Sequence, residues 1–331
     1  TDGPLLIVAG AGTGKTTVIT KKIAYLIEQG LAKPDEILAL TFTDKSAGEM
    51  EERVDRLLPY GYVDLWISTF HSFCEKILKN HGIEIGLPEF ELLSETKQWL
   101  LIRKNIEKFD LDYYRPMGNP TKFFRSLLTH FSRAKDELVT SEDYLNHAKN
   151  IKLDGDNADT PHFEKGGTGG IFEDDKKKIN EVANAYHAYN QLLLEAGALD
   201  FGDLINWTLK LFNNRPKILT EYRDKFKYVL VDEFQDTNFA QYELVKLLSA
   251  PKNNLTVVGD DDQSIYRFRG ASMSNILTFD KDFSNSKKIV LTKNYRSGQN
   301  ILDGAYKFIS LNNPNRLEVR LGNNLSKKLE S

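Results

Sequence analysis

The sequence feature that most constrains the fold is the run AGAGTGKT, which occupies residues 9–16 and follows the apolar run LLIVA. Its glycines let the backbone turn tightly and direct N–H groups towards phosphate oxygens. A helix that begins here adds the positive end of its dipole. The general pattern has glycine where this chain has Ala9. We predict a strand, a phosphate-binding loop and a helix, in that order.

The end of this loop carries two side chains with separate expected roles. Lys15 supplies a positive charge for the β and γ phosphates of a nucleotide, and Thr16 offers a hydroxyl group to Mg²⁺. The residues expected to contact the nucleotide from this loop are Gly10, Ala11, Gly12, Thr13, Gly14, Lys15, Thr16 and Thr17.

Short apolar runs rich in β-branched residues recur along the chain and are mostly followed by helical periodicity. This alternation predicts an α/β fold with a mainly parallel sheet covered by helices. The expected strands are Leu5–Ala9, Ile37–Phe42, Leu65–Ser68, Tyr228–Val231, Leu255–Val258 and Ile289–Leu291.

The stretch from residue 90 to residue 199 differs, because it has helical patterns without a convincing strand. A connection of this length is better explained as an all-helical insertion domain than as a loop. Within it, residues 151–178 are rich in Gly, Asp and Lys and are expected to form a flexible surface loop. The string KGGTGG at 165–170 lacks a preceding strand and a following Gly-Lys-Thr, so it is not a second phosphate loop.

The predicted strand before VLVDEFQD ends in two adjacent carboxylates, Asp232 and Glu233. An apolar strand that delivers an acidic residue at its carboxyl end is typical of the second half of a phosphate-loop NTPase. Asp232 is expected to hold Mg²⁺, and Glu233 to accept a proton from the attacking water. The pair favours ATP hydrolysis over a kinase or a GTPase switch.

Two further strings add candidate catalytic groups. Gln263 follows the next strand, in GDDDQ, where its amide could contact the γ-phosphate or the attacking water. Tyr295 and Arg296 occur in NYRS, and Arg296 is a candidate arginine finger.

Composition excludes several classes of protein. The 331 residues include 44 Lys and Arg against 47 Asp and Glu, so the net charge of −3 excludes a globally basic nucleic-acid binder but leaves room for a local basic groove. Cys74 is the only cysteine, which excludes an intrachain disulfide and a multi-cysteine metal site. It is expected to be a buried small hydrophobe in a reducing compartment. No apolar run approaches the length of a membrane span.

Residues 97–135 are locally basic and interleave their cations with aromatic side chains. Charge for phosphates combined with flat rings for bases is the composition of a nucleic-acid contact. An ordinary helical core with a solvated basic face explains the same residues, and the sequence leaves both interpretations open.

Taken together, these strings resemble the UvrD/Rep/PcrA family of superfamily 1 DNA helicases. Seven motifs occur in the family's order: AGAGTGKT, LALTFTDKSAGEM, ISTFHSF, ALDFGDLI, VLVDEFQDTN, VVGDDDQSIYRFRGA and NYRS. The resemblance implies a RecA-like ATPase domain formed by residues 1–89 and 200–285, interrupted by the insertion at 90–199. It implies that residues 286–331 begin a second RecA-like domain.

The resemblance also implies an activity: ATP-driven, 3′ to 5′ translocation on single-stranded DNA, with unwinding at single/double-strand junctions. It implies ATP and Mg²⁺ as cofactors, a monomer in the bacterial cytoplasm associated with the nucleoid, and Tyr295 stacked on adenine. The residues that it assigns to DNA contact are Phe42, Thr43, Lys45, Thr69, His71, Phe201, Tyr266, Phe268 and Arg269.

The chain departs from the family pattern at three positions. Asp44 stands where Asn is common, Phe268 where Trp is common, and Thr17 where Arg often covers adenine. The abrupt start and the motifs missing after Ser331 lead us to expect an N-terminal fragment of a longer protein, unable to unwind DNA alone. A helicase–nuclease subunit of the RecB or AddA type, and a module that binds ATP or DNA without turnover, remain alternatives.

Overall fold

The computed structural model describes residues 2–58, 64–151, 173–263, 274–314, 316–320 and 326–331. The contacts between residues divide the chain into two compact units. Unit 1 comprises residues 1–85 and 207–331, and unit 2 comprises residues 86–206. Among the helices that the structure describes, none has both the length and the apolar character that a membrane span requires.

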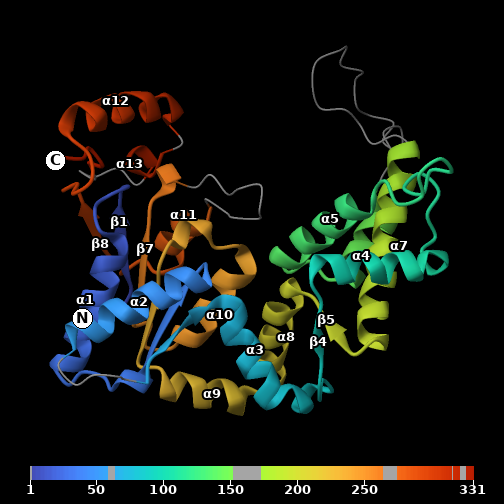
Figure 1. The fold of residues 1–331 in the computed structure, drawn as a ribbon, viewed down its shortest axis with the longest axis horizontal. Coiled ribbons are helices and arrows are strands. Elements are labelled where there is room, and N and C mark those ends of the chain that lie inside the picture. The colour runs from blue at the N-terminus through green and yellow to red at the C-terminus, as the bar shows by residue number, and fades with distance from the viewer. Residues whose placement is uncertain (1, 59–63, 152–172, 264–273, 315, 321–325) are drawn as a thin grey trace. The chain divides into compact units, whose positions relative to one another are not determined.

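Unit 1 is built on a parallel sheet, which in the described residues has the strand order β3-β2-β6-β7-β1-β8 (Figure 1). This confirms the predicted α/β class and all six expected strands. The strands are β1 (Leu5–Ala9), β2 (Ile37–Thr41), β3 (Trp66–Thr69), β6 (Tyr228–Val231), β7 (Leu255–Gly259) and β8 (Lys287–Leu291).

Helices connect and cover these strands, as parallel pairing requires. They are α1 (Lys15–Glu28), α2 (Asp44–Leu57), α3 (Phe70–His81), α9 (Pro216–Lys225), α10 (Phe239–Ser249), α11 (Ser274–Asp282), α12 (Gln299–Ile309) and α13 (Leu317–Arg320). Helix α8 (Phe201–Asn214) runs across the boundary between the two units.

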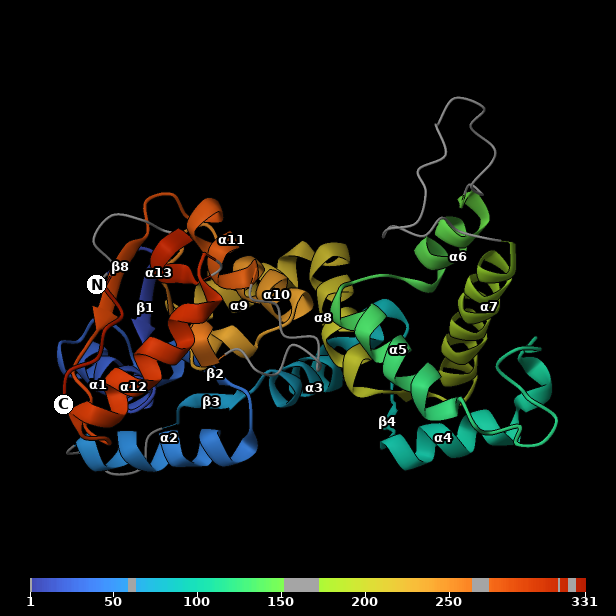
Figure 2. The ribbon, with the colours of Figure 1, turned by 90° about the horizontal axis from the view of Figure 1, so that it is seen from above.

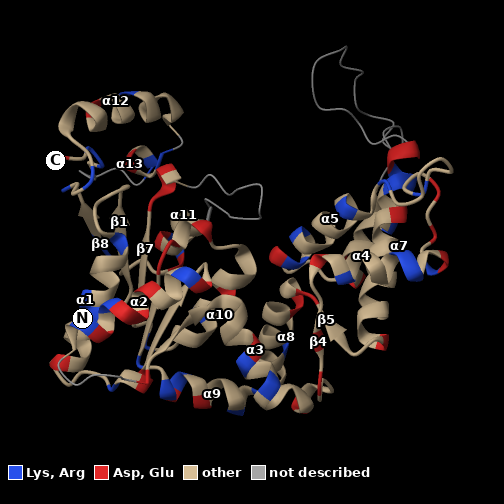
Figure 3. Ribbon diagram, in the orientation of Figure 1, with Lys and Arg blue, Asp and Glu red and all other residues tan. Residues whose placement is uncertain are grey.

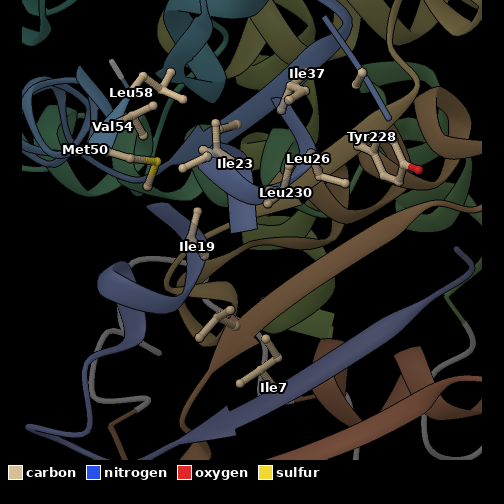
Figure 4. Packing of buried hydrophobic residues seen from close by; sticks show 14 of the residues in the cluster. Ile7, Ile19, Ile23, Leu26, Ile37, Met50, Val54, Leu58, Tyr228 and Leu230 are labelled. Carbon is tan, nitrogen blue, oxygen red and sulfur yellow. The ribbon is translucent and has the colours of Figure 1, made fainter. Parts of the chain in front are cut away.

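The core of unit 1 explains the apolar patterns of the chain. Ile7 of β1 and Leu230 of β6 pack with Ile19 and Ile23 of α1 and with Met50 of α2 (Figure 4). The alternate β1 residues Leu6 and Val8 are also buried. Both faces of the strand are therefore covered, which gives the continuous apolar run that the sequence shows.

Strand β8 pairs with β1 in register, Ile7 opposite Ile289, although it lies in the segment 286–331 that the sequence assigns to a second domain. The sheet therefore extends past residue 286. That residues after β8 begin a second RecA-like domain stays a prediction. Helices α12 and α13 follow β8 and lie beyond the carboxyl ends of β1 and β7 (Figures 1 and 2).

Unit 2 is mainly helical. Its helices are α4 (Glu95–Lys104), α5 (Phe124–Asp136), α6 (Ser141–Asn150) and α7 (Glu173–Glu195). Phe131 stacks on Tyr186 and Tyr189, with ring centroids 5.1 and 5.3 Å away, at the centre of its apolar cluster. Residues 152–172 of the predicted loop 151–178, including the string KGGTGG, lie outside the described residues. Residues 173–178 begin α7, so the prediction of a loop is wrong for them.

One feature of unit 2 corrects the sequence analysis. The expected insertion is not all-helical, because β4 (Glu91–Leu92) and β5 (Ala198–Leu199) pair in parallel near its two ends. A pair of two-residue strands has too few residues to produce a recognisable alternation, so sequence pattern alone does not reveal it. The pairing joins the entry and the exit of the insertion.

Candidate nucleotide and DNA site

The predicted phosphate loop connects β1 to α1. Gly12 and Gly14 have φ values of 78° and 87°, which only glycine adopts readily. The Thr13 hydroxyl group donates a hydrogen bond of 2.8 Å to the Gly10 carbonyl and closes the turn. The turn directs the loop into the first residue of α1, Lys15, so the N-terminus of this helix faces the loop.

Lys15 joins the residues that follow two other strands. Its ammonium lies 2.7 Å from Oε2 of Glu233 and donates a hydrogen bond of 3.0 Å to Oε1 of Gln263. The Lys15 side chain is 9% exposed and that of Glu233 is 32% exposed. Three residues that are far apart in the sequence thus meet where β1, β6 and β7 end, at the carboxyl edge of the sheet.

The predicted metal-binding pair is also in contact. The Thr16 hydroxyl donates a hydrogen bond of 2.8 Å to Oδ2 of Asp232, which is buried. Burial and the neighbouring Glu233 raise the pKa of Asp232, whereas the hydrogen bond from Thr16 opposes this shift. Glu233 has φ 50° and ψ 44°, a left-handed conformation that is uncommon for a residue with a side chain. This backbone turn lies two residues after Val231, the last residue of β6.

Two residues that the sequence analysis missed complete the arrangement. Gln235 donates a hydrogen bond of 2.7 Å to Glu233 through Nε2, and its Oε1 accepts one of 3.0 Å from the Asp260 backbone N–H. Asp260 Oδ2 accepts a hydrogen bond of 2.6 Å from the side chain of Gln263. Lys15, Gln263, Asp260, Gln235 and Glu233 therefore form a closed ring of polar contacts.

A close approach between the end of β7 and the turn after β6 makes this ring possible. A Cβ on Gly259 would lie 2.8 Å from Oε1 of Gln235, so any other residue there would displace the amide. The sequence carried a signal for the ring, since Gln235 and Asp260 stand in the strings DEFQD and GDDDQ beside predicted site residues. These two strings alone do not indicate which of their side chains are in contact.

The NYRS segment lies against the phosphate loop. Asn294 donates a hydrogen bond of 2.6 Å to the Ala11 carbonyl, and the Tyr295 backbone N–H donates one of 2.9 Å to the Gly12 carbonyl. A Cβ on Gly12 would lie 2.7 Å from Nδ2 of Asn294. The side chain of Tyr295 is 74% exposed, and Arg296 is exposed as well. Asn294 is thus a further residue that the sequence analysis missed.

Residues 1–284 match the family described as UvrD/REP helicase N-terminal domain. The chain belongs to this family.

Curated relatives of this chain carry the name ATP-dependent DNA helicase PcrA. The protein from Bacillus subtilis (strain 168) is 44% identical over 318 residues, which are 96% of this chain and 38% of that protein. The protein from Leuconostoc citreum is 42% identical over 95% of this chain, and the one from Staphylococcus aureus (strain Mu50 / ATCC 700699) is 40% identical over 94%. The chain spans about 38% of the length of each of these relatives.

The residues that the resemblance assigns to DNA contact fall into three groups in this UvrD/REP chain. The first group shares the carboxyl edge of the sheet with the nucleotide residues: Phe42, Thr43 and Lys45 follow β2, Thr69 is the last residue of β3, and His71 follows it. Lys45 is exposed, whereas Thr69 is buried and accepts a hydrogen bond from the Ser72 backbone N–H as the N-cap of α3. The side chain of Thr69 therefore has a structural role in the helix start.

The second group is Phe201 alone, which belongs to unit 2. Its side chain is 47% exposed at the first turn of α8. The third group, Tyr266, Phe268 and Arg269, lies outside the described residues.

A buried ionic cluster lies next to Phe201 in the sequence. The Lys135 ammonium is 2.7 Å from Oδ2 of Asp200 and 2.8 Å from Oδ1 of Asp203, and its side chain is 2% exposed. Asp200 and Asp203 also exchange side-chain hydrogen bonds with each other's backbone N–H, as in a capping box. The Tyr189 hydroxyl donates a further hydrogen bond of 2.9 Å to Asp200.

The basic and aromatic stretch at 97–135 divides between core and surface. Phe124 is fully buried, and Trp99 packs against the same apolar cluster. Tyr113, which is 51% exposed, stacks on Phe123 with ring centroids 5.8 Å apart. Cys74 is buried, and burial raises the pKa of its thiol to about 12, as expected for a structural cysteine.

Proposed function

We propose that the protein that carries this chain is an ATP-dependent DNA helicase. It hydrolyses ATP to move along single-stranded DNA from 3′ to 5′ and unwinds duplex at single/double-strand junctions. It acts as a monomer on the nucleoid, in the bacterial cytoplasm. The observation that carries the proposal is the meeting of Lys15 and Thr16 with Asp232, Glu233 and Gln263 at one edge of the sheet. DNA as the substrate, and its unwinding, are inferred from the names of the relatives, which are ATP-dependent DNA helicases.

The donor set fits ATP and Mg²⁺. The Thr16 hydroxyl and the Asp232 carboxylate lie within 2.8 Å of each other and offer the oxygen ligands that Mg²⁺ prefers. The loop glycines supply backbone N–H groups and Lys15 a positive charge for phosphates. When bound, Mg²⁺ neutralises charge that develops on the transferred phosphate oxygens.

The protein side chains divide the remaining work. Glu233 takes the proton of the attacking water, and Gln263 orients that water. In this structure Glu233 is paired with Lys15. Phosphate oxygens compete for the same ammonium, so nucleotide binding frees the Glu233 carboxylate to act as a base. The exposed Arg296 offers its charge to the γ-phosphate, and Tyr295 stacks on adenine.

Translocation requires contacts that tolerate any base. Phe42, Phe201, Tyr266 and Phe268 offer aromatic faces, whereas Lys45, His71 and Arg269 offer cations to the phosphates. Thr43 would add a hydroxyl contact to the backbone of the strand, and Thr69 would act on that contact surface by fixing the start of α3, which it caps. Stacking on successive bases is tolerant of sequence and thus suits a motor that steps along any strand.

We also propose that residues after β8 begin a second RecA-like domain. Helix α12 and the turn after it expose Ile301, Phe308 and Leu311 by 66%, 75% and 77%. Exposed apolar side chains on one short segment are typical of a surface that another part of the protein, or a partner, covers. A second domain packed here would close on ATP as the motor cycles. The 331-residue chain alone should therefore bind ATP but turn it over far more slowly than the full-length protein, which steady-state assays of both will test.

The central experiment measures ATP hydrolysis by the full-length protein with and without single-stranded DNA. We expect turnover to rise with DNA. The variant Glu233→Gln should bind ATP normally but lower kcat by about 10²- to 10⁴-fold, the usual contribution of a general base. Glu221→Gln, an exposed acid on α9, is the matched control. Absence of stimulation by DNA would contradict the helicase, and near-normal turnover in Glu233→Gln would contradict its role as base.

A further inference from the structure

Three consecutive carboxylates follow β7, and two cations from the end of the chain bind them. Asp260, Asp261 and Asp262 are the acidic residues at the carboxyl end of this strand (Figure 3). One oxygen of each lies within 4.8 Å of the others. Arg316 and Lys327 reach them from the residues after α12. We refer to these five residues as the latch.

Lys327 is the central cation of the latch. Its ammonium lies 2.7 Å from Oδ1 of Asp260 and 2.7 Å from Oδ2 of Asp262, and it also pairs with Asp261. The Lys327 side chain is 4% exposed. Although burial acts to lower the pKa of Lys327, the three carboxylates raise it above its usual value. The ammonium is therefore charged and held by three acids at once.

Arg316 provides the second cation. Its guanidinium binds Asp262 through two hydrogen bonds, 2.9 Å from Nε and 2.7 Å from Nη2, and its side chain is 3% exposed. The Leu317 backbone N–H donates a hydrogen bond of 2.7 Å to Asp261. The bidentate geometry fixes the orientation of Arg316 as well as its distance. The segment after α12 is thus bound to all three acids.

The latch is directly connected to the nucleotide residues. Asp260 binds Lys327 through Oδ1 and accepts the amide of Gln263 through Oδ2, at 2.6 Å. Gln263 in turn accepts a hydrogen bond from Lys15. A single carboxylate therefore joins the cation of the C-terminal segment to the glutamine expected to orient the attacking water.

We propose that Lys327 is a positioning residue for ATP hydrolysis, which holds Gln263 in place through Asp260. Arg316 fixes the same loop through Asp262, so the positions of Arg316 and Lys327 govern the position of Gln263. This inference rests on the proposed function and adds a route by which the segment after α12 controls hydrolysis. Without Lys327, Asp260 and Asp261 repel each other with no cation between them, and the anchor of Gln263 is lost.

The test compares Lys327→Met with Lys328→Met in the full-length protein. Lys328 is the adjacent lysine; its side chain is 58% exposed and lies 3.9 Å from Asp303. We expect Lys327→Met to lower kcat for ATP roughly tenfold, the effect of losing one hydrogen bond to a charged group. KM for ATP should change less than about twofold, because the phosphate loop is intact. Lys328→Met should leave both constants unchanged.

A merely structural role for Lys327 would give a different pattern. General loss of folded protein would lower the amount of active enzyme, together with the melting temperature. The double variant Asp261→Asn with Lys327→Met removes one carboxylate together with the lysine ammonium. It therefore restores most of the charge balance among these side chains. Asp261 makes none of the described contacts with Gln263, so we expect the double variant to recover part of kcat. Equal kcat in wild type and Lys327→Met, or equal losses in both lysine variants, would overturn the proposal.

Hydrogen exchange separates this inference from the proposed function, because it needs no turnover. Amide exchange of the peptide that contains residues 255–263 should be faster in Lys327→Met than in wild type and unchanged in Lys328→Met. If wild type hydrolyses no ATP, the helicase proposal fails and this exchange comparison still tests the latch. Unchanged exchange in Lys327→Met would overturn the latch whatever the turnover.

Discussion

Each unit contains a lysine held by polar side chains, and the two settings differ in their access to solvent. In unit 1, Lys15 contacts Glu233, whose side chain is 32% exposed. In unit 2, the side chains of Lys135, Asp200 and Asp203 are 2%, 8% and 10% exposed. A partner that reaches solvent can be exchanged for a ligand at little cost. A fully buried partner cannot be exchanged, since the lysine would be left charged and unpaired.

An ion pair by itself therefore does not identify a functional site. Both lysines have ion-pair distances of 2.7 Å, and both lie beside motifs that the sequence singled out. What distinguishes Lys15 is the glycine loop that precedes it and the exposure of Glu233. The buried cluster around Lys135 instead fixes the start of α8, where Asp200 and Asp203 cap the helix.

The largest expected effect on stability is that of Lys135→Met. Removing one member of a buried ion pair leaves uncompensated charge, so we expect the free energy of unfolding of unit 2 to fall by about 3–5 kcal/mol. Urea denaturation of the variant measures this. Lys104→Met, which removes an exposed lysine of the same unit, is the control and should change stability by less than about 0.5 kcal/mol. A loss below 1 kcal/mol for Lys135→Met would break the distinction between the two lysines.

Lys15→Ala should affect nucleotide binding rather than the stability of the fold. We expect it to weaken nucleotide binding by about 1.5–3 kcal/mol, the range for hydrogen bonds to charged groups, and to leave the stability of the fold nearly unchanged. Titration with a fluorescent ATP analogue measures the first effect and thermal unfolding the second. The exposed Lys21 on the same helix provides the control variant Lys21→Ala. Normal nucleotide affinity in Lys15→Ala would contradict the phosphate role.

Tyr189→Phe tests the buried cluster by removing a single hydrogen bond rather than a charged group. It removes the hydroxyl that donates to Asp200 and keeps the ring in place. We expect a loss of about 1.5 kcal/mol in the free energy of unfolding, because the acceptor is charged and stays buried. Tyr113→Phe, at a ring that is 51% exposed, should have no measurable effect. Equal effects of the two variants would show that the cluster is less dependent on its hydrogen bonds than its burial indicates.

The smallest expected effect concerns pH at the nucleotide site. Burial and the nearby Glu233 raise the pKa of Asp236 to about 6 from the model-peptide value of 3.8, and its Oδ1 accepts no hydrogen bond from the described residues. The folded state therefore binds more protons than the unfolded state between these two pH values. The contribution of Asp236 to stability is thus lost as pH rises through that window.

Asp236→Asn should remove this part of the pH dependence. Urea denaturation of wild type and variant between pH 4 and pH 7 measures it, and the stability difference between them should grow in favour of the variant as pH rises. A difference that is independent of pH would show that Asp236 titrates at the same pH in both states.

Much of the fold could be predicted from the sequence because its signals are local. The apolar runs gave all six strands of the central sheet, and the glycine run located the turn before α1. Asp232 and Glu233 could be placed because a strand end fixes where the next residues lie. The family motifs then ordered the remaining candidates.

What could not be predicted depends on contacts between distant parts of the chain. Lys327 has no distinguishing neighbours in the sequence, and its role arises only when it meets Asp260. The same is true of Gln235, whose amide contacts residues of two different loops. Trp99 and Phe124 looked like base-stacking candidates, but their packing inside unit 2 is a tertiary property.

The short pairing of β4 with β5 has a consequence for how this chain tolerates change. Glu91 and Ala198 are opposite each other in register, so the two ends of the insertion are held at a fixed separation whatever lies between them. Lengthening or shortening the segment between these strands therefore exerts no pull on β6, which precedes Asp232, or on α1, which begins at Lys15. The insertion can therefore vary in length while the hydrolytic residues of unit 1 keep their register.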